Sequence, residues 1–294
     1  MRIHASAAIA ISVLITLASP AGAFVCPSMK PGIARAMAGW QVPGLAIGIV
    51  RNGKIVYRGT FGVRDTDTGI AVTVKTVFAT GSITKSLTAL GAAIAASEGK
   101  IDLDRPVRRI LGYFPKDISL RHLLSHTAGW PRHDALWYLD RYARHELPQK
   151  LSLLPRLAAG GQSFQYNNVP FAAAGIALGR ATGAEWNDWV QAKILTPAGM
   201  TDAVTTLSGF RNMTDRASPY FPSDTGRIPL PLRDTDPVAP AAGLYAPLDD
   251  MLRYLELLAN DGIVGRHRVI PAAPIKSLRR PVTAGYGLGL RLGD

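Results

Sequence analysis

The sequence predicts an α+β fold in which strands come first, a helical segment follows, and strand structure returns near the end. Two β-rich runs surround an Asn-Gly pair near the start. From about residue 102 to residue 243 the chain consists of helical pieces broken by Pro-rich loops. Residues 284–290 then have strand character. This order is typical of an α/β unit that carries a helical insertion.

The first residues have the pattern of a secretory signal. A basic start at Arg2 precedes an apolar stretch over residues 7–18 and the small residues Ala21-Gly22-Ala23. We predict a signal peptide over residues 1–23, cleaved after Ala23, and a periplasmic or secreted mature protein. Cys26 is the single cysteine, so the chain can form no internal disulfide.

The first predicted element after the signal is a β-hairpin. Residues 45–50 and 55–61 are rich in β-branched and aromatic side chains, and Asn52-Gly53 lies between them. An Asn-Gly pair between two such runs is a strong hairpin signal, because both residues tolerate positive φ angles.

The most informative motif is Ser82-Ile83-Thr84-Lys85. It follows an extended run at residues 77–80, and Gly81 gives the backbone freedom for a sharp turn. Residues 82–96 contain no proline and are rich in Ala, Leu and Ile, which predicts a buried helix. Residues three apart on a helix are neighbours, so the Lys85 amine can reach the Ser82 hydroxyl. A desolvated lysine has a lowered pKa and can accept a proton, so the motif has the parts of an activated serine nucleophile.

The spacing alone is not specific, because Ser97-Glu98-Gly99-Lys100 repeats it. There we expect a structural role, with Gly99 ending the helix and Lys100 at the negative end of its dipole.

Further helices are expected later in the chain. The patterns indicate helices over residues 120–125, 169–182, 185–195 and 248–260. We therefore predict one mature domain over 24–294, with an α/β part at 24–103 and 246–294 and a helical part at 104–245.

A second motif is Tyr166-Asn167-Asn168. Gly160-Gly161 before it and Pro170 after it indicate a loop. A tyrosine hydroxyl can relay protons, and an asparagine amide can both donate to and accept from a substrate. The alternative is a surface turn with an ordinary aromatic residue.

Taken together, the motifs resemble the serine β-lactamase and penicillin-binding-protein superfamily, in particular its class C-like branch of D-aminopeptidases and esterases. The segments that carry the resemblance occur in order along nearly the whole mature chain: 78–85, 121–129, 131–134 with Trp137, 164–168, 197–200, 242–244 with Asp249-Asp250, and 286–289.

The resemblance implies a fold and a set of roles. The fold would be an antiparallel sheet flanked by helices plus an all-helical domain, with the site between them. Ser82 resembles the nucleophile, Lys85 its partner, Tyr166 the proton shuttle and Asn168 a substrate contact. The implied activity is that of an exported serine hydrolase that acts through an acyl-enzyme on an amide, β-lactam, D-amino-acid peptide or ester.

The sequence departs from the family pattern in one respect. The family carries a Lys/His-x-Gly motif on a strand soon after the segment that matches residues 286–289. Here the only Lys-x-Gly is Lys30-Pro31-Gly32, and the sequence stops at Asp294. We therefore expect a C-terminally truncated member that lacks the later sheet strands. The alternative function is a catalytically impaired fragment or pseudoenzyme that only binds such ligands.

Composition and motif searches weigh against other classes. The formal charge of +12 comes without interleaved aromatic residues near its basic clusters, so we predict no nucleic-acid partner but possible association with an anionic cell envelope. His122 and His126 have helical zinc-pair spacing, but no Glu follows His122, and we predict no metal. Neither a Gly-x-Ser-x-Gly elbow nor a Gly-x-Gly-x-x-Gly fingerprint in a strand–helix setting occurs, and we predict no cofactor. The expected partner is a small-molecule or peptide substrate.

Overall fold

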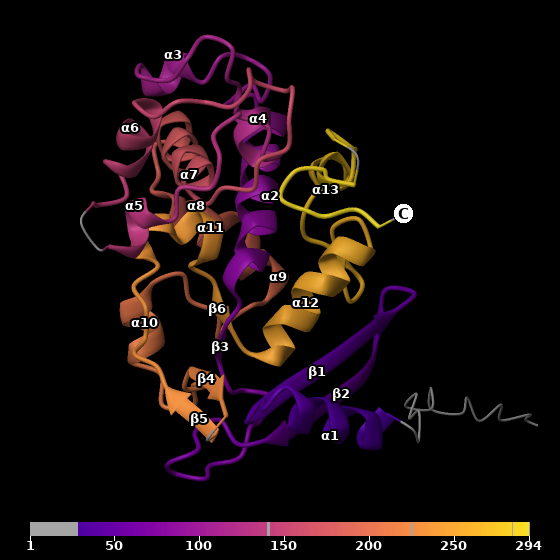
Figure 1. Cartoon of the computed structure of the whole chain (residues 1–294). Coiled ribbons are helices and arrows are strands. Elements are labelled where there is room, and N and C mark those ends of the chain that lie inside the picture. The colour runs from indigo at the N-terminus through magenta and orange to yellow at the C-terminus, as the bar shows by residue number, and fades with distance from the viewer. Residues whose placement is uncertain (1–28, 140–141, 225, 284, 294) are drawn as a thin grey trace, which may run out of the picture.

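The computed structural model describes residues 29–139, 142–224, 226–283 and 285–293 (Figure 1). The predicted signal peptide, its cleavage site and Cys26 lie outside the described residues. The mixture of helices with antiparallel strand pairs confirms the predicted α+β class. The strands are β1 (Gly44–Arg51), β2 (Lys54–Gly62), β3 (Phe78–Ala79), β4 (Tyr220–Ser223), β5 (Gly226–Pro229), β6 (Tyr245–Ala246), β7 (Ile263–Val264) and β8 (His267–Arg268).

Helices make up most of the remaining regular structure. They are α1 (Met29–Gly39), α2 (Thr84–Ser97), α3 (Arg108–Leu111), α4 (Leu120–Leu124), α5 (Ala135–Tyr138), α6 (Leu147–Ser152), α7 (Val169–Thr182), α8 (Trp186–Val190), α9 (Thr196–Ala198), α10 (Leu207–Arg211), α11 (Ala239–Ala242), α12 (Leu248–Ala259) and α13 (Ala272–Leu278). Short 3-10 turns occur at η1 (Gly81–Ile83) and η3 (Asp236–Val238), and α8 continues into a π-helical turn, η2 (Gln191–Leu195).

The predicted hairpin is confirmed. β1 and β2 pair in antiparallel register from Gly44↔Gly62 to Arg51↔Lys54, with a bulge at Ile49/Val50. Asn52 and Gly53 both have positive φ, as a tight two-residue turn requires. α12 packs on β1, where a side chain at Gly48 would collide with Leu252.

α2 is the central helix of the molecule (Figure 1). Every residue from Thr84 to Ala95 is buried, because α7, α11 and α13 pack around it. Two tryptophans of α8 donate hydrogen bonds to α2. Trp186 Nε1 donates to Thr88 Oγ1 at 2.9 Å, and Trp189 Nε1 donates to the Gly91 carbonyl at 3.0 Å. The helix that carries the serine motif is thus fixed inside the core.

The predicted strand at 284–290 is wrong. The described residues there form a loop with isolated bridges at Tyr286 instead of a ladder. The reason lies in the glycines. Gly285 and Gly289 have positive φ, and a side chain at Gly289 would lie 2.4 Å from the carbonyl oxygen of Lys85. The segment is a close-approach loop laid against α2.

The segment 104–245, expected to be helical, also contains strands. β4 and β5 form a hairpin whose residues are mostly exposed, and β6 pairs with β3. The predicted boundaries between the α/β part and the helical part stay a prediction. Across the described ranges, none of the helices is both long and apolar enough to cross a bilayer.

Candidate active site

The Ser82 turn lies where an extended segment meets the central helix. β3 ends at Ala79, Gly81 takes a positive φ of 56°, and η1 leads directly into α2. The backbone therefore turns sharply, and Ser82 remains exposed while Lys85, three residues later, is only 1% exposed. The turn places one hydroxyl at the surface and one amine beneath it.

Three oxygen atoms surround the Lys85 amine. Nζ lies 2.9 Å from Ser82 Oγ, 2.8 Å from Asn168 Oδ1 and 3.1 Å from the carbonyl oxygen of Ala241. An amide oxygen and a backbone carbonyl can only accept hydrogen bonds, whereas a hydroxyl can also donate one. A neutral amine has two hydrogens and one lone pair. When its two hydrogens go to Asn168 and Ala241, the lone pair faces the Ser82 hydroxyl.

Burial favours that neutral form. Desolvation lowers the pKa of the Lys85 amine from 10.5 to about 7, Asp134 opposes the shift, and Arg132 adds to it. A lysine that is half neutral near pH 7 can act as a general base.

Tyr166 contacts the same hydroxyl from the other side. Its phenolic oxygen lies 2.7 Å from Ser82 Oγ, and the Lys85 ammonium position is 4.9 Å from its ring centroid. Burial raises the pKa of Tyr166, with the Ser82 hydrogen bond opposing the shift, so the phenol keeps its proton at neutral pH. The three groups form a continuous hydrogen-bonded path, and when the Lys85 amine is neutral Tyr166 can donate to Ser82 and Ser82 to Lys85.

His126 packs against the ring of Tyr166, a contact that the sequence did not indicate. Its ring centroid lies 4.2 Å from that of Tyr166 and 5.0 Å from that of Phe171. Desolvation, followed by the nearby Lys85, lowers the pKa of His126 to about 3, so the ring is neutral. Nδ1 accepts from the backbone N–H of Asn167 at 3.3 Å. The buried imidazole thus packs against the Tyr166 ring.

The structure thus brings together all four predicted site residues and separates the repeated motif. Ser97 Oγ donates to the Ile94 carbonyl of its own helix at 2.7 Å, while Lys100 lies 4.0 Å from Glu98. Gly99 has a φ of 71° and follows the end of α2. The structural interpretation of this second Ser-x-x-Lys is confirmed.

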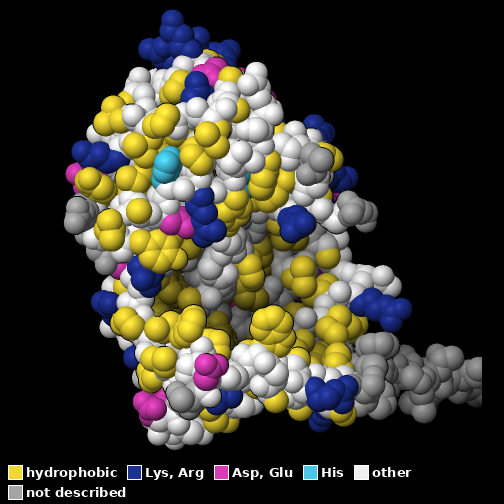
Figure 2. All heavy atoms as spheres, in the orientation of Figure 1, with side chains coloured by type: hydrophobic (Ala, Val, Ile, Leu, Met, Phe, Trp, Pro, Cys, Tyr) yellow, Lys and Arg dark blue, Asp and Glu magenta, His cyan; other side chains and the backbone are white. Residues whose placement is uncertain are grey.

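Two of the hollows in the described part of the chain bear on where a ligand could enter. One, of about 670 Å³, is lined by Tyr166, whose hydroxyl contacts Ser82, together with Phe164, Gly285, Tyr286, Arg291, Leu292 and Gly293. The face in Figure 2 is hollowed between the helical half and the β1–β2 hairpin, and hydrophobic side chains line that hollow.

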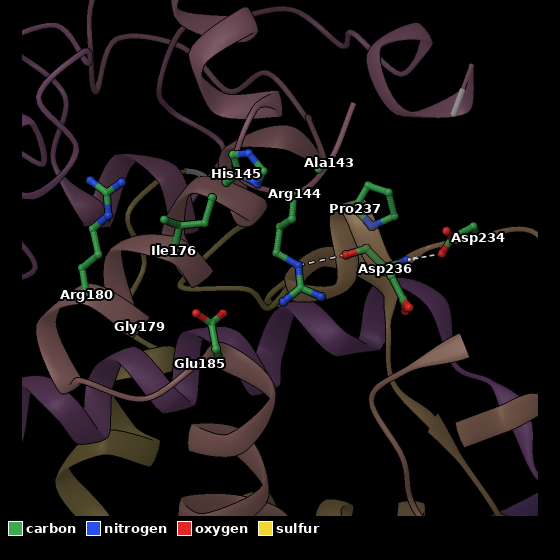
Figure 3. Close-up of a pocket in the computed structure, with 10 residues that line it drawn as sticks. All are labelled: Ala143, Arg144, His145, Ile176, Gly179, Arg180, Glu185, Asp234, Asp236 and Pro237. Atoms are coloured by element: carbon green, nitrogen blue, oxygen red, sulfur yellow. Dashed lines mark hydrogen bonds between the residues drawn. The ribbon is translucent and has the colours of Figure 1, made fainter. Parts of the chain in front are cut away.

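The other hollow, of about 580 Å³, contains no predicted site residue (Figure 3). Its most buried cation, Arg144, is already engaged: Nε donates to the Asp236 carbonyl and Nη1 to Asn187 Oδ1, both at 2.9 Å. These bonds tie the loop before α6 to η3 and α8, which gives Arg144 a structural role. Among the residues that the structure describes, no group of three or more His, Cys, Asp or Glu side chains is placed to hold a metal ion.

The sequence also missed Arg132 and Asp134, which lie behind Asn168. Both fall in the 131–134 segment that carried the resemblance, but nothing in their spacing assigned them a role. Asn168 Nδ2 donates to Asp134 Oδ1 at 3.0 Å.

Comparison with known proteins identifies the family. The family model described as Beta-lactamase matches residues 33–294. Penicillin-binding protein 4* of Bacillus subtilis is 24% identical over 81% of this chain and 57% of its own length. Esterase EstB of Burkholderia gladioli is 28% identical over 74% of this chain and 66% of its own length. The chain therefore spans about three fifths of the length of these relatives.

Solved structures agree on the fold. The octameric penicillin-binding protein homologue from Pyrococcus abyssi superposes with a TM-score of 0.78 at 24% identity, covering 90% of this chain and 64% of that one. D-alanine carboxypeptidase AmpC from Burkholderia cenocepacia gives a TM-score of 0.71 at 27% identity, over 86% and 68%. The fold is β-lactamase/transpeptidase-like, and the chain belongs to the beta-lactamase family.

Proposed function

We propose that the chain is a serine hydrolase that forms an acyl-enzyme on Ser82. The observation that carries the proposal is the buried Lys85 amine, whose Nζ lies 2.9 Å from Ser82 Oγ and within hydrogen-bond distance of two further oxygens, Asn168 Oδ1 and the Ala241 carbonyl. The substrate class is an ester, amide, D-amino-acid peptide or β-lactam. The names of the relatives, among them an esterase, penicillin-binding proteins and a D-alanine carboxypeptidase, support that range.

The geometry supports a simple sequence of steps. Lys85 takes the Ser82 proton as Oγ attacks the substrate carbonyl, and the backbone N–H of Ser82 donates to the oxyanion. Tyr166 donates its phenolic proton to the leaving group, and the Lys85 ammonium, whose Nζ lies over the Tyr166 ring, returns the proton taken from Ser82 to the phenolate oxygen, because the acylated Oγ no longer carries one. Water then attacks the acyl-enzyme by the reverse of this route and releases the acid.

The proposal extends to location and partners. We infer an exported protein, on the strength of the basic, apolar and small-residue pattern in residues 1–23. Its partner would be a small-molecule or peptide substrate, and its net positive charge favours an anionic envelope surface over nucleic acid. N-terminal sequencing of protein recovered from a periplasmic fraction tests this, and a chain that still begins at Met1 would contradict it.

The decisive experiment maps the acylated residue. The protein is incubated with a fluorescent penicillin and, separately, an activated ester, and then digested for mass spectrometry. We expect the adduct on Ser82, and its loss in Ser82→Ala together with a fall in turnover of at least about 10³-fold. Ser97→Ala is the matched control, because it removes a serine with the same Ser-x-x-Lys spacing.

The alternative function gives a different result. A pseudoenzyme that only binds such ligands would show a dissociation constant for the penicillin but neither a covalent adduct nor ester turnover. Turnover that survives in Ser82→Ala would overturn the assignment of the nucleophile.

A further inference from the structure

Asp134 stands directly behind the amide that holds Lys85. Its Oδ1 accepts from Asn168 Nδ2 at 3.0 Å and from Trp137 Nε1 at 2.9 Å, and its Oδ2 accepts from Arg132 Nε. The Asp134 side chain is only 18% exposed. It precedes α5, and its side chain makes no capping hydrogen bond to the backbone of that helix; its partners are the side chains of Asn168, Trp137 and Arg132.

The protonation state of Asp134 decides how the Asn168 amide is oriented. Burial raises the pKa of the Asp134 carboxyl, but hydrogen bonds from Trp137, Arg132 and Asn168 outweigh it, and the pKa lies below its usual value. An ionised carboxylate can only accept hydrogen bonds. Asn168 must therefore present its NH₂ group to Asp134, which leaves Oδ1 to face the Lys85 amine at 2.8 Å.

We propose that Asp134 is a positioning residue for the proton acceptor: it fixes the Asn168 amide, and through it the direction of the Lys85 lone pair, with Arg132 as its counter-ion. The inference rests on the proposed function, since it concerns the same proton transfer. With the amide reversed, NH₂ would face the Lys85 hydrogens and the lone pair would no longer be directed at Ser82. Asp134 acts through Asn168 and touches neither Ser82 nor Lys85 by any hydrogen bond that the structure describes.

The surroundings of Lys85 give the proposal a distinctive signature. The groups that face it are the oxygens of Asn168 and Ala241, the neutral rings of Tyr166 and His126, and the charged pair Asp134 and Arg132. The Asp134 charge favours the protonated amine, and the Arg132 charge disfavours it. The acid limb is the low-pH side of the pH–activity profile, where activity rises as Lys85 loses its proton. Removal of the Asp134 charge should therefore move this limb to lower pH, and removal of the Arg132 charge should move it to higher pH.

The test measures kcat/KM for p-nitrophenyl acetate as a function of pH, which reports the ionisations of the free enzyme. In Asp134→Asn, the new amide oxygen can still accept from Asn168, so we expect the acid limb at lower pH with much of the plateau retained. In Arg132→Gln the limb should move to higher pH. In Asp134→Ala the amide is released, and the plateau should fall by about 10²-fold.

Controls separate positioning from stability. Asp104→Asn removes a carboxylate from another ion pair, with Arg121, and should leave the limb in place. If Asp134→Ala fails to fold by circular dichroism, Asp134→Asn decides the matter, because its amide oxygen can still accept from Asn168 and the plateau should be retained. A plateau in Asp134→Ala equal to that of the wild type, or a plateau in Asp134→Asn that falls by about 10²-fold, overturns the proposal even where Ser82 is acylated as expected. Turnover that persists in Ser82→Ala means instead that the proposed function itself has failed.

Discussion

The burial of Lys85 links the stability of the fold to pH. The amine is 1% exposed, and desolvation lowers its pKa from 10.5 to about 7. Between these two values the unfolded chain binds a proton that the folded chain does not, so the free energy of unfolding should rise with pH. Below pH 7 both states carry the proton and the full cost of burying the charge is present. Above pH 10.5 the cost disappears.

The magnitude follows from the two pKa values. At about 1.36 kcal/mol per pKa unit, the gap between 10.5 and about 7 corresponds to about 5 kcal/mol. A change from pH 6 to pH 9 should release roughly half of it, about 2.5 kcal/mol. Urea denaturation of the wild type and of Lys85→Met at both pH values isolates this part, because other titrating groups contribute equally to both proteins. Lys100→Met, which removes an exposed lysine just beyond the same helix, controls for the loss of one charge.

The expected result is a wild-type gain between pH 6 and pH 9 that exceeds the gain of Lys85→Met by about 2.5 kcal/mol. Lys100→Met should behave as the wild type does. Parallel stability curves for the wild type and Lys85→Met would refute the argument, because they would mean that Lys85 has the same pKa in the folded and unfolded states.

Three further outcomes are expected. Tyr166→Phe removes the 2.7 Å hydrogen bond to the serine but keeps the ring, so steady-state turnover should fall by about 10²–10⁴-fold while the thermal midpoint stays nearly constant; an equal loss of stability would point to a packing role. Gly289→Ala places a methyl group 2.4 Å from the carbonyl oxygen of Lys85, at a residue with positive φ, and calorimetry should show a loss of about 1–3 kcal/mol in the free energy of unfolding. Gly293→Ala is the control, because a side chain there meets open space and should change the stability little. Leu252→Ala empties the contact between α12 and β1 and should cost about 2–5 kcal/mol in urea denaturation, and a smaller cost would mean that the hairpin collapses onto the helix.

Local chemistry predicted the elements whose residues all favour one structure. Asn52-Gly53 between β-rich runs gave the hairpin, and the Pro-free apolar run after Gly81 gave α2. The run at 284–290 misled because its spacing resembles a strand, while its glycines serve a close approach to α2 that only the folded neighbour reveals. Exposed β4 and β5 carry too weak an alternation to be recognised.

In the candidate site too, residues that are close in the sequence could be predicted, and contacts between distant segments could not. Ser82 and Lys85 could be identified from the sequence because they contact each other and lie only three residues apart on one helical turn. Tyr166 and Asn168 were assigned through the resemblance, since no local pattern connects them to a serine 84 positions earlier. Asp134 could not be found from the sequence, because its role depends on which end of an amide it faces.

The Lys85 amine also has a consequence for how the active protein is formed. Its three oxygen partners come from segments that are 3, 83 and 156 residues away along the chain. Contacts of such long sequence separation form slowly, because the intervening loops must close first. The far-UV circular dichroism signal of the helices should therefore recover early in refolding. Hydrolytic activity should recover only with the slowest phase, when the Ala241 carbonyl reaches the Lys85 amine.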